Sequence, residues 1–253
     1  MADCHFPAAN RHEEKLTAEL QRSLSTVKPA LLRLAESLTE IHTRDPFTSV
    51  IVEERSGHFT GVFVAEALGF HKSGRVFFAH PKPAVARSGS SLEAETAFIT
   101  ANCGRHPLIV TEAILSGNTA AAWLTSFFAQ GISPSYASLT YELRGWDLLD
   151  QKLLAVPDRH DPGAPRLRRV VRGVGLAYVL NPKPVCSALN AIPVPDYGVS
   201  LLSESAQDRW LAETSDSDEL SSRMRVIEIA QTELTALLAE FRARQMGSNT
   251  PVA

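Results

Sequence analysis

The stretch that decides the fold is Pro107-Leu108-Ile109-Val110-Thr111-Glu112-Ala113-Ile114-Leu115-Ser116-Gly117-Asn118-Thr119-Ala120. It predicts an apolar strand over residues 108–111, an acidic turn, a loop of small residues and an Ala-rich helix over residues 119–130. Similar strand and helix patterns alternate through the middle of the chain, with further strands expected at 50–53, 76–79 and 135–140 and helices at 60–68 and 93–102. This alternation is typical of an α/β protein built on a parallel sheet.

The loop in this stretch is suited to an anion. Ser, Gly, Asn and Thr at the start of a helix turn several backbone N–H groups toward one point, and the helix dipole adds positive charge there. Glu112 at the strand end would lie beside that point, where sugar hydroxyls can donate to its carboxylate. We therefore expect a sugar phosphate as ligand. The alternative is an ordinary strand–turn–helix corner, in which Ser and Thr only cap the helix.

This segment resembles the phosphoribosyl-pyrophosphate (PRPP) motif of type I phosphoribosyltransferases. That motif is an apolar strand, two acidic residues, a short and mostly apolar spacer, and a Thr-Gly-x-Thr-like loop. Thr111-Glu112 falls on the acidic pair and Ser116-Gly117-Asn118-Thr119 on the loop, without gaps. Thr111 departs from the pattern, because a hydroxyl stands where the family has its first acid.

A second segment resembles the pyrophosphate-loop region of the same family, and most closely that of the adenine-type enzymes. After an apolar strand, Arg55-Ser56-Gly57-His58-Phe59 is a permuted version of the family's loop, and a helix ending in Leu68-Gly69 follows. A short strand comes next, and residues 82–95, rich in Pro, Ser and Gly, occupy the place of the family's mobile catalytic loop. The resemblance covers about residues 45–142.

The resemblance implies a role for each matching residue. The catalytic positions are Glu112, Thr111 and Arg55, and the 5'-phosphate would be bound by Ser116, Gly117, Asn118 and Thr119. The pyrophosphate would be bound by Arg55, Ser56, Gly57, Lys82 and Arg87. The alternative for Lys82 and Arg87, and the more common outcome for such residues, is that they are solvated loop charges. Mg²⁺ is expected to arrive with PRPP, and no side chain is expected to bind a metal directly.

The chain divides into five parts. Residues 1–45 form an N-terminal helical segment, 46–142 a phosphoribosyltransferase-like core, 143–202 an irregular region with short strands near 170–174 and 176–180 that is a candidate hood, 203–246 C-terminal helices, and 247–253 a disordered tail. Pro29 predicts either a kink or two helices in the first part. Apolar stripes mark both helical ends: Leu20, Leu24, Val27, Leu31, Leu34, Leu38 and Ile41 in the first, and Leu220, Met224, Ile227, Leu234, Leu238 and Phe241 in the second. The helical ends are expected to pack on each other, on the sheet, or on those of a second subunit as a homodimer.

Composition restricts the partners. The chain has 253 residues and a net charge of −3, so it has no general attraction for nucleic acid. The basic cluster Arg166, Arg168, Arg169 and Arg172 could contact nucleic-acid phosphates, but we expect a solvated face or intramolecular pairing instead. No apolar run reaches the roughly 20 residues of a membrane span, and no signal peptide is recognisable, so a cytoplasmic protein is expected. Three scattered cysteines predict neither a disulfide framework nor a zinc site.

Three functions follow from these observations. The first is a phosphoribosyltransferase that moves phosphoribose between pyrophosphate and a nitrogenous base. The second is a catalytically weak or inactive regulatory module that binds PRPP or a nucleotide, as the hydroxyl at Thr111 would favour. The third is an interaction protein that uses its terminal helices on the same scaffold.

Overall fold

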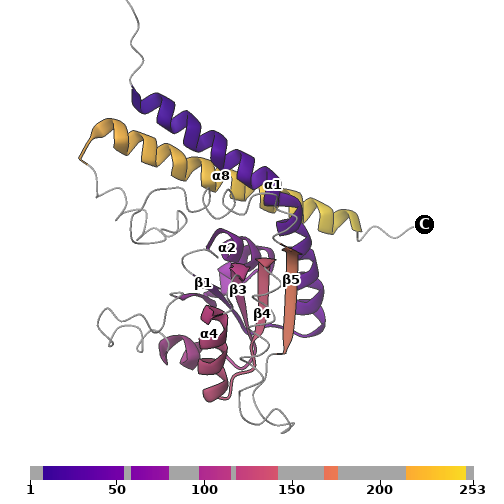
Figure 1. Cartoon of the computed structure of the whole chain (residues 1–253). Coiled ribbons are helices and arrows are strands. Elements are labelled where there is room, and N and C mark those ends of the chain that lie inside the picture. The colour runs from indigo at the N-terminus through magenta and orange to yellow at the C-terminus, as the bar shows by residue number, and fades with distance from the viewer. Residues whose placement is uncertain are drawn as a thin grey trace, which may run out of the picture.

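The protein is built on a five-stranded, all-parallel sheet with strand order β2-β1-β3-β4-β5 (Figure 1). The computed structural model describes residues 8–53, 58–79, 97–114, 118–141, 168–175 and 215–248. The strands are β1 (Ser49–Glu53), β2 (Val76–Ala79), β3 (Pro107–Ile114), β4 (Ser135–Tyr141) and β5 (Arg169–Gly175). The expected α/β class with a parallel sheet is therefore confirmed.

Strand β3 is longer than the sequence predicts. It continues beside β4 after β1 has ended, with Ala113 opposite Thr140 and Ile114 opposite Tyr141. The expectation that Glu112 stands at the strand end is therefore wrong, because the β4 pairing carries the strand two residues further. Glu112 instead lies within β3, just beyond the last residue of β1 in the register.

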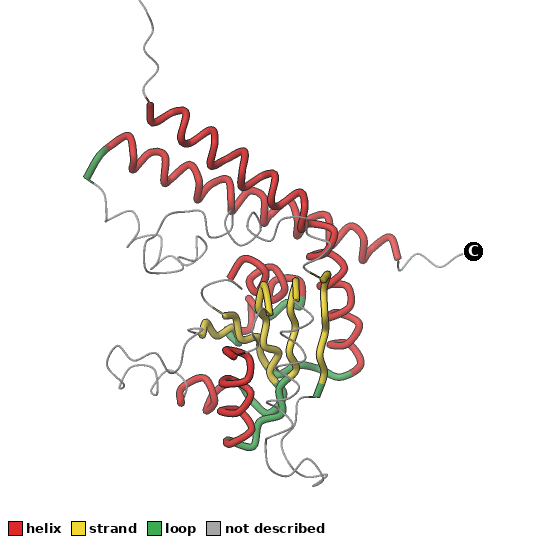
Figure 2. The backbone as a smooth tube through the Cα atoms, viewed as in Figure 1, coloured by secondary structure: helices red, strands yellow, loops and turns green. Residues whose placement is uncertain are grey.

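Helices cover both faces of the sheet (Figure 2). On one face, α2 (His58–Ala67), α1 (Ala8–Arg44) and α8 (Ser217–Ser248) pack on the even-numbered residues of β1 and β3. On the other face, α4 (Asn118–Ala129) and a helical segment at residues 97–102 pack on Ile51, Ile109 and Tyr136. The two faces have separate apolar cores because consecutive strand residues point to opposite sides.

Helix α1 is a single helix with Pro29 inside it, so the prediction of two helices is wrong. The helix changes direction partway along its length, as an internal proline predicts (Figure 1). Its apolar stripe is buried at Val27, Leu31, Leu34 and Leu38.

Helix α8 lies beside α1 (Figure 1). Lys28 Nζ is 2.5 Å from Glu240 Oε2, and Arg244 is 3.7 Å from Glu36. Leu238 and Phe241 are buried, whereas Met224 of the predicted stripe is 49% exposed. The two ends of the chain therefore pack on each other within one molecule.

The region 143–202 contributes β5 to the sheet, beside β4. Residues 176–214, which include the second predicted short strand, lie outside the described residues. Helix α8 runs through Gly247 to Ser248, so the first two residues of the predicted disordered tail are helical. Residues 249–253 also lie outside the described ranges.

A polar cluster joins α1, β3, β4 and β5 at the amino edge of the sheet. His106 is buried, with Nδ1 3.2 Å from the Pro46 carbonyl oxygen and Nε2 3.0 Å from Ser135 Oγ. Asp45, directly after α1, accepts two 2.9 Å hydrogen bonds from Arg168. The carboxyl end of α1 is thus fixed at the amino edge of the strands.

Because the polar cluster fixes the carboxyl end of α1 at the amino edge of the sheet, it also determines where the rest of the helix lies. At 1.5 Å per residue its 37 residues span about 55 Å, whereas the 8 residues of β3 span only about 26 Å. Because α1 runs antiparallel to the strands, its amino-terminal half projects past their carboxyl edge (Figure 1). Within the described ranges, none of the helices combines the length and apolar character that a bilayer crossing requires.

Candidate functional site

The candidate site lies where the direction of strand connection reverses. From β1 the chain goes outward to β2, and it then returns to β3 on the other side of β1. In open parallel sheets the crevice at the carboxyl ends of two such strands is the usual place for a ligand. Glu53 is the last residue of β1, and Thr111 and Glu112 lie beside it on β3.

Glu112 is the most unusual side chain at this place. It is fully buried, and among the described residues neither of its carboxyl oxygens has a hydrogen-bond partner. Burial raises the pKa of Glu112 well above its ordinary value, and the nearby charge of Glu53 raises it further. An unpaired buried carboxyl costs about 1–3 kcal/mol, and more when it is charged. Such a group is costly to fold and is therefore a candidate for function.

Glu53 provides a second carboxyl group that the sequence analysis did not assign to the site. Its Oε2 accepts a hydrogen bond from the hydroxyl of Thr111, which is itself fully buried. Burial raises the pKa of Glu53, while the Thr111 hydrogen bond acts in the opposite direction. Thr111, the residue that departs from the family motif, thus holds an acid supplied by the neighbouring strand.

Tyr136 belongs to the same group of side chains as Glu53 and Thr111. It is buried on the α4 face of the sheet. Its pKa is raised well above the ordinary value by burial and by the charge of Glu53, against a smaller lowering from hydrogen bonding to Thr111. The phenol therefore stays protonated, and a phenolic O–H can donate as well as accept a hydrogen bond.

A second unpaired group lies on the α2 face of the sheet, to which Glu112, as an even-numbered residue of β3, also points. Thr60, in the first turn of α2, is fully buried, and its hydroxyl has no hydrogen-bond partner within the described ranges. In the part of the chain that the structure describes, this hydroxyl and the two Glu112 oxygens are the buried side-chain polar atoms without a partner. Helix α2 lies close to β1 there, since a Cβ on Gly61 would collide with the Val52 side chain.

The predicted phosphate and pyrophosphate groups are only partly described. Helix α4 begins at Asn118, so Asn118 and Thr119 form its first turn at the carboxyl end of β3. Ser116 and Gly117 lie outside the described residues, and so do all the predicted pyrophosphate-binding residues: Arg55, Ser56, Gly57, Lys82 and Arg87. Among the described residues, no group of three or more His, Cys, Asp or Glu side chains is placed to hold a metal ion.

Of the site residues Glu53 and Thr60, neither of which was predicted, only Glu53 has a signal in the sequence. Glu53 ends a predicted strand, and the acidic ends of neighbouring parallel strands meet at one edge of a sheet. The pairing with Thr111, however, depends on the register of β1 and β3. Thr60 carries no signal in the sequence, because its burial results from the packing of α2 on the sheet.

Comparison of the chain with protein-family models, with curated proteins and with solved structures gave no match.

Proposed function

We propose that this protein has a phosphoribosyltransferase-like core that binds PRPP or a nucleotide at the carboxyl ends of β1 and β3. The proposed reaction transfers phosphoribose between pyrophosphate and a nitrogenous base. The observation that carries the proposal is Glu112, which lies where the direction of strand connection reverses. It is the one buried acid among the described residues whose carboxyl oxygens have no hydrogen-bond partner.

The ribose diol gives this carboxyl the partners it lacks. Two vicinal hydroxyl groups can donate to the two oxygens of Glu112, which then no longer needs to be neutral. Glu53 points to the other face of the sheet and acts on Glu112 through its charge, which raises the pKa of Glu112. Loss of the Glu112 proton on binding would place negative charge beside the sugar ring.

The 5'-phosphate has a natural place at the start of α4. The first N–H groups of a helix have no partner within the helix, and the dipole there favours an anion. Asn118 and Thr119 supply this first turn directly after β3. Ribose and phosphate positions thus follow one another along the chain, in the order that the PRPP motif requires.

In the proposed reaction the bond from C1' to the pyrophosphate oxygen breaks, and its electron pair leaves with pyrophosphate. A lone pair on the base nitrogen then forms the new bond to C1', and the base releases a proton. Positive charge develops on the ribose ring between these events, and the carboxylates of Glu112 and Glu53 would stabilise it. Mg²⁺ bound to the pyrophosphate would neutralise the leaving group.

A regulatory module that binds PRPP or a nucleotide without turnover is the second candidate. Thr111 favours it, because one of the two acids of the family motif is replaced by a hydroxyl. The partner-binding alternative would use α1 and α8, which project past the sheet, and would not need Glu112.

Phosphorus NMR separates these candidates. The protein is mixed with PRPP, Mg²⁺ and each common purine and pyrimidine base, and pyrophosphate release is followed against Glu112→Gln and the exposed control Glu228→Gln. Release that needs Glu112 but not Glu228 supports the transferase. Binding of PRPP without release assigns the regulatory module, and neither binding nor release contradicts both.

A further inference from the structure

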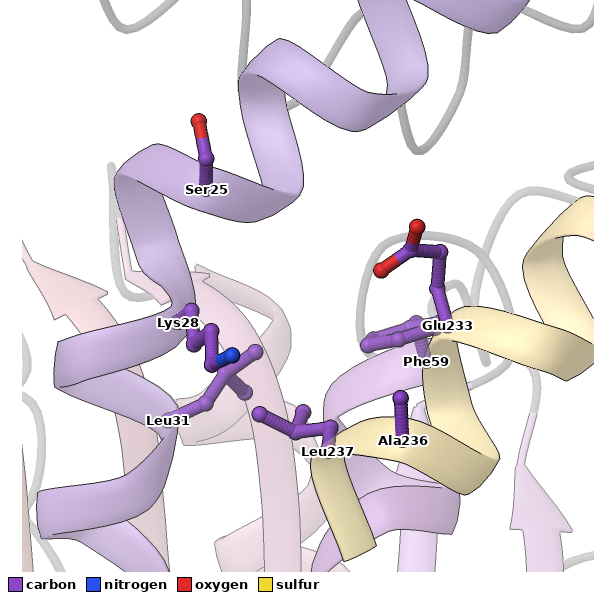
Figure 3. A pocket seen from close by; sticks show the side chains of 7 residues that line it. All are labelled: Ser25, Lys28, Leu31, Phe59, Glu233, Ala236 and Leu237. Atoms are coloured by element: carbon purple, nitrogen blue, oxygen red, sulfur yellow. The ribbon is translucent and has the colours of Figure 1, made fainter. Parts of the chain in front are cut away.

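A pocket of about 230 Å³ lies between the two terminal helices and the first turn of α2 (Figure 3). Three helices supply its lining: Ser25, Lys28 and Leu31 from α1, Phe59 from α2, and Glu233, Ala236 and Leu237 from α8. None of these residues belongs to the proposed ribose and phosphate site. The pocket is therefore a candidate binding site that is separate from the proposed ribose and phosphate site.

The floor of the pocket is apolar. Leu31 and Leu237 are buried, and Phe59 is 8% exposed, so the aromatic ring is held in place by its surroundings. Phe59 and the two leucines can cover the faces of a small ring and exclude water from it. At about 230 Å³ the space is smaller than the roughly 300–1,000 Å³ of sites for drug-sized molecules, so a single ring with a short substituent is the appropriate size.

Four charged side chains beside the pocket form one ion-pair network between α1 and α8. Lys28 pairs with Glu240 at 2.5 Å, Glu240 accepts from Arg244 at 2.8 Å, and Arg244 is 3.7 Å from Glu36. This network has two positive and two negative groups and is balanced.

Glu233 remains outside that network. Within the described part of the chain it forms neither an ion pair nor a hydrogen bond, and its carboxylate points into the space between α1 and α8, above Phe59 (Figure 3). An acid beside an aromatic ring is the arrangement that favours a cation, since both the carboxylate and the ring face attract positive charge.

We propose that this pocket binds a small organic cation, a single ring that carries a protonated amine. The ring packs on Phe59, Leu31 and Leu237, and the ammonium group donates to Glu233. A ligand held in this way contacts α1, α2 and α8 at once. Its binding therefore stabilises the packing of the helix pair against the sheet domain.

Benzylamine is a suitable probe, because it is positively charged at pH 7 and has one ring. Its affinity is measured by NMR titration of the full-length protein beside benzyl alcohol, which has nearly the same shape and no charge. We expect benzylamine to bind at least tenfold more tightly than benzyl alcohol. Glu233→Gln should abolish this difference, and Glu228→Gln, an exposed acid on the same helix, should preserve it.

A second variant tests the pocket rather than the charge. Ala236 lines the pocket and is exposed, so Ala236→Leu should fill the space without unfolding the protein, and should weaken benzylamine binding with Glu233 intact. Thermal unfolding of each variant checks that it is folded. Absence of benzylamine binding, equal affinity for the two probes, or binding that is unchanged in both Glu233→Gln and Ala236→Leu would overturn the proposal.

Discussion

Replacing Glu112 by methionine should make the protein more stable while removing its ligand binding. Methionine is similar in length and volume to glutamate and has no polar oxygens, so it fills the same space without leaving unpaired groups. Glu112 is fully buried, and both of its oxygens lack partners in the part of the chain that the structure describes. Removing an unsatisfied buried polar group recovers about 1–3 kcal/mol. For a chain of this size each kcal/mol corresponds to about 2–4 °C in Tm, so we expect an increase of roughly 2–12 °C.

The assay is urea and thermal unfolding of Glu112→Met beside the native protein, at pH 7 and without ligand. Two threonines provide a matched comparison. Thr60→Val removes a buried hydroxyl with no partner and should be neutral or stabilising, whereas Thr140→Val removes the 2.9 Å hydrogen bond to the Glu112 carbonyl and should cost about 0.5–1.5 kcal/mol. A loss of stability in Glu112→Met would refute the reasoning, because the carboxyl would then have partners in the folded protein.

Three further predictions concern pH and packing. Burial raises the pKa of Glu112 above 4.5. The stability that its protonated form contributes is therefore complete below pH 4.5 and is lost as the pH rises through the raised pKa. In urea titrations at several pH values, Glu112→Gln should remove this dependence, which amounts to at most about 1.4 kcal/mol in unfolding free energy per pH unit. The pKa of His106 is lowered from 6.5, first by burial and then by Arg168, so its contribution is present above pH 6.5 and is lost as the pH falls. His106→Gln should weaken this acid sensitivity in thermal scans, and part should remain through His42, whose pKa burial also lowers. Gly61→Ala should destabilise the protein in urea, because the clash with Val52 costs about 1–3 kcal/mol and the gain in helix propensity returns at most about 1.

The sequence was sufficient to predict the strands and the parallel α/β class of the sheet, but not the order of the strands. Alternating apolar strands and helices predicted an α/β protein, and all five described strands overlap predicted ones. Strand β5 overlaps the short strand predicted near 170–174, but nothing in the sequence shows that β5 pairs with β4. That pairing depends on contacts between segments distant in the chain.

The details of the site were less accessible. The sequence directed attention to Thr111 and Glu112, but the burial of Glu112 depends on the continuation of β3 beside β4 and on the position of α2. The partnership of Glu53 with Thr111 depends on the register of β1 and β3. In helix α1, Pro29 correctly predicted a change of direction. The sequence did not show whether the helix would continue past Pro29 or end there.

Calorimetric titration with PRPP and Mg²⁺ tests the central claim most directly. The native protein, Glu112→Met and Glu228→Gln are each titrated under one set of conditions, with ribose 5-phosphate and nucleoside monophosphates as further ligands. We expect binding to the native protein and to Glu228→Gln, and none to the stable, folded Glu112→Met. Binding that is equal in all three proteins would contradict the assigned role of Glu112, and absence of binding of any phosphorylated sugar to the native protein would contradict the proposed function as a whole.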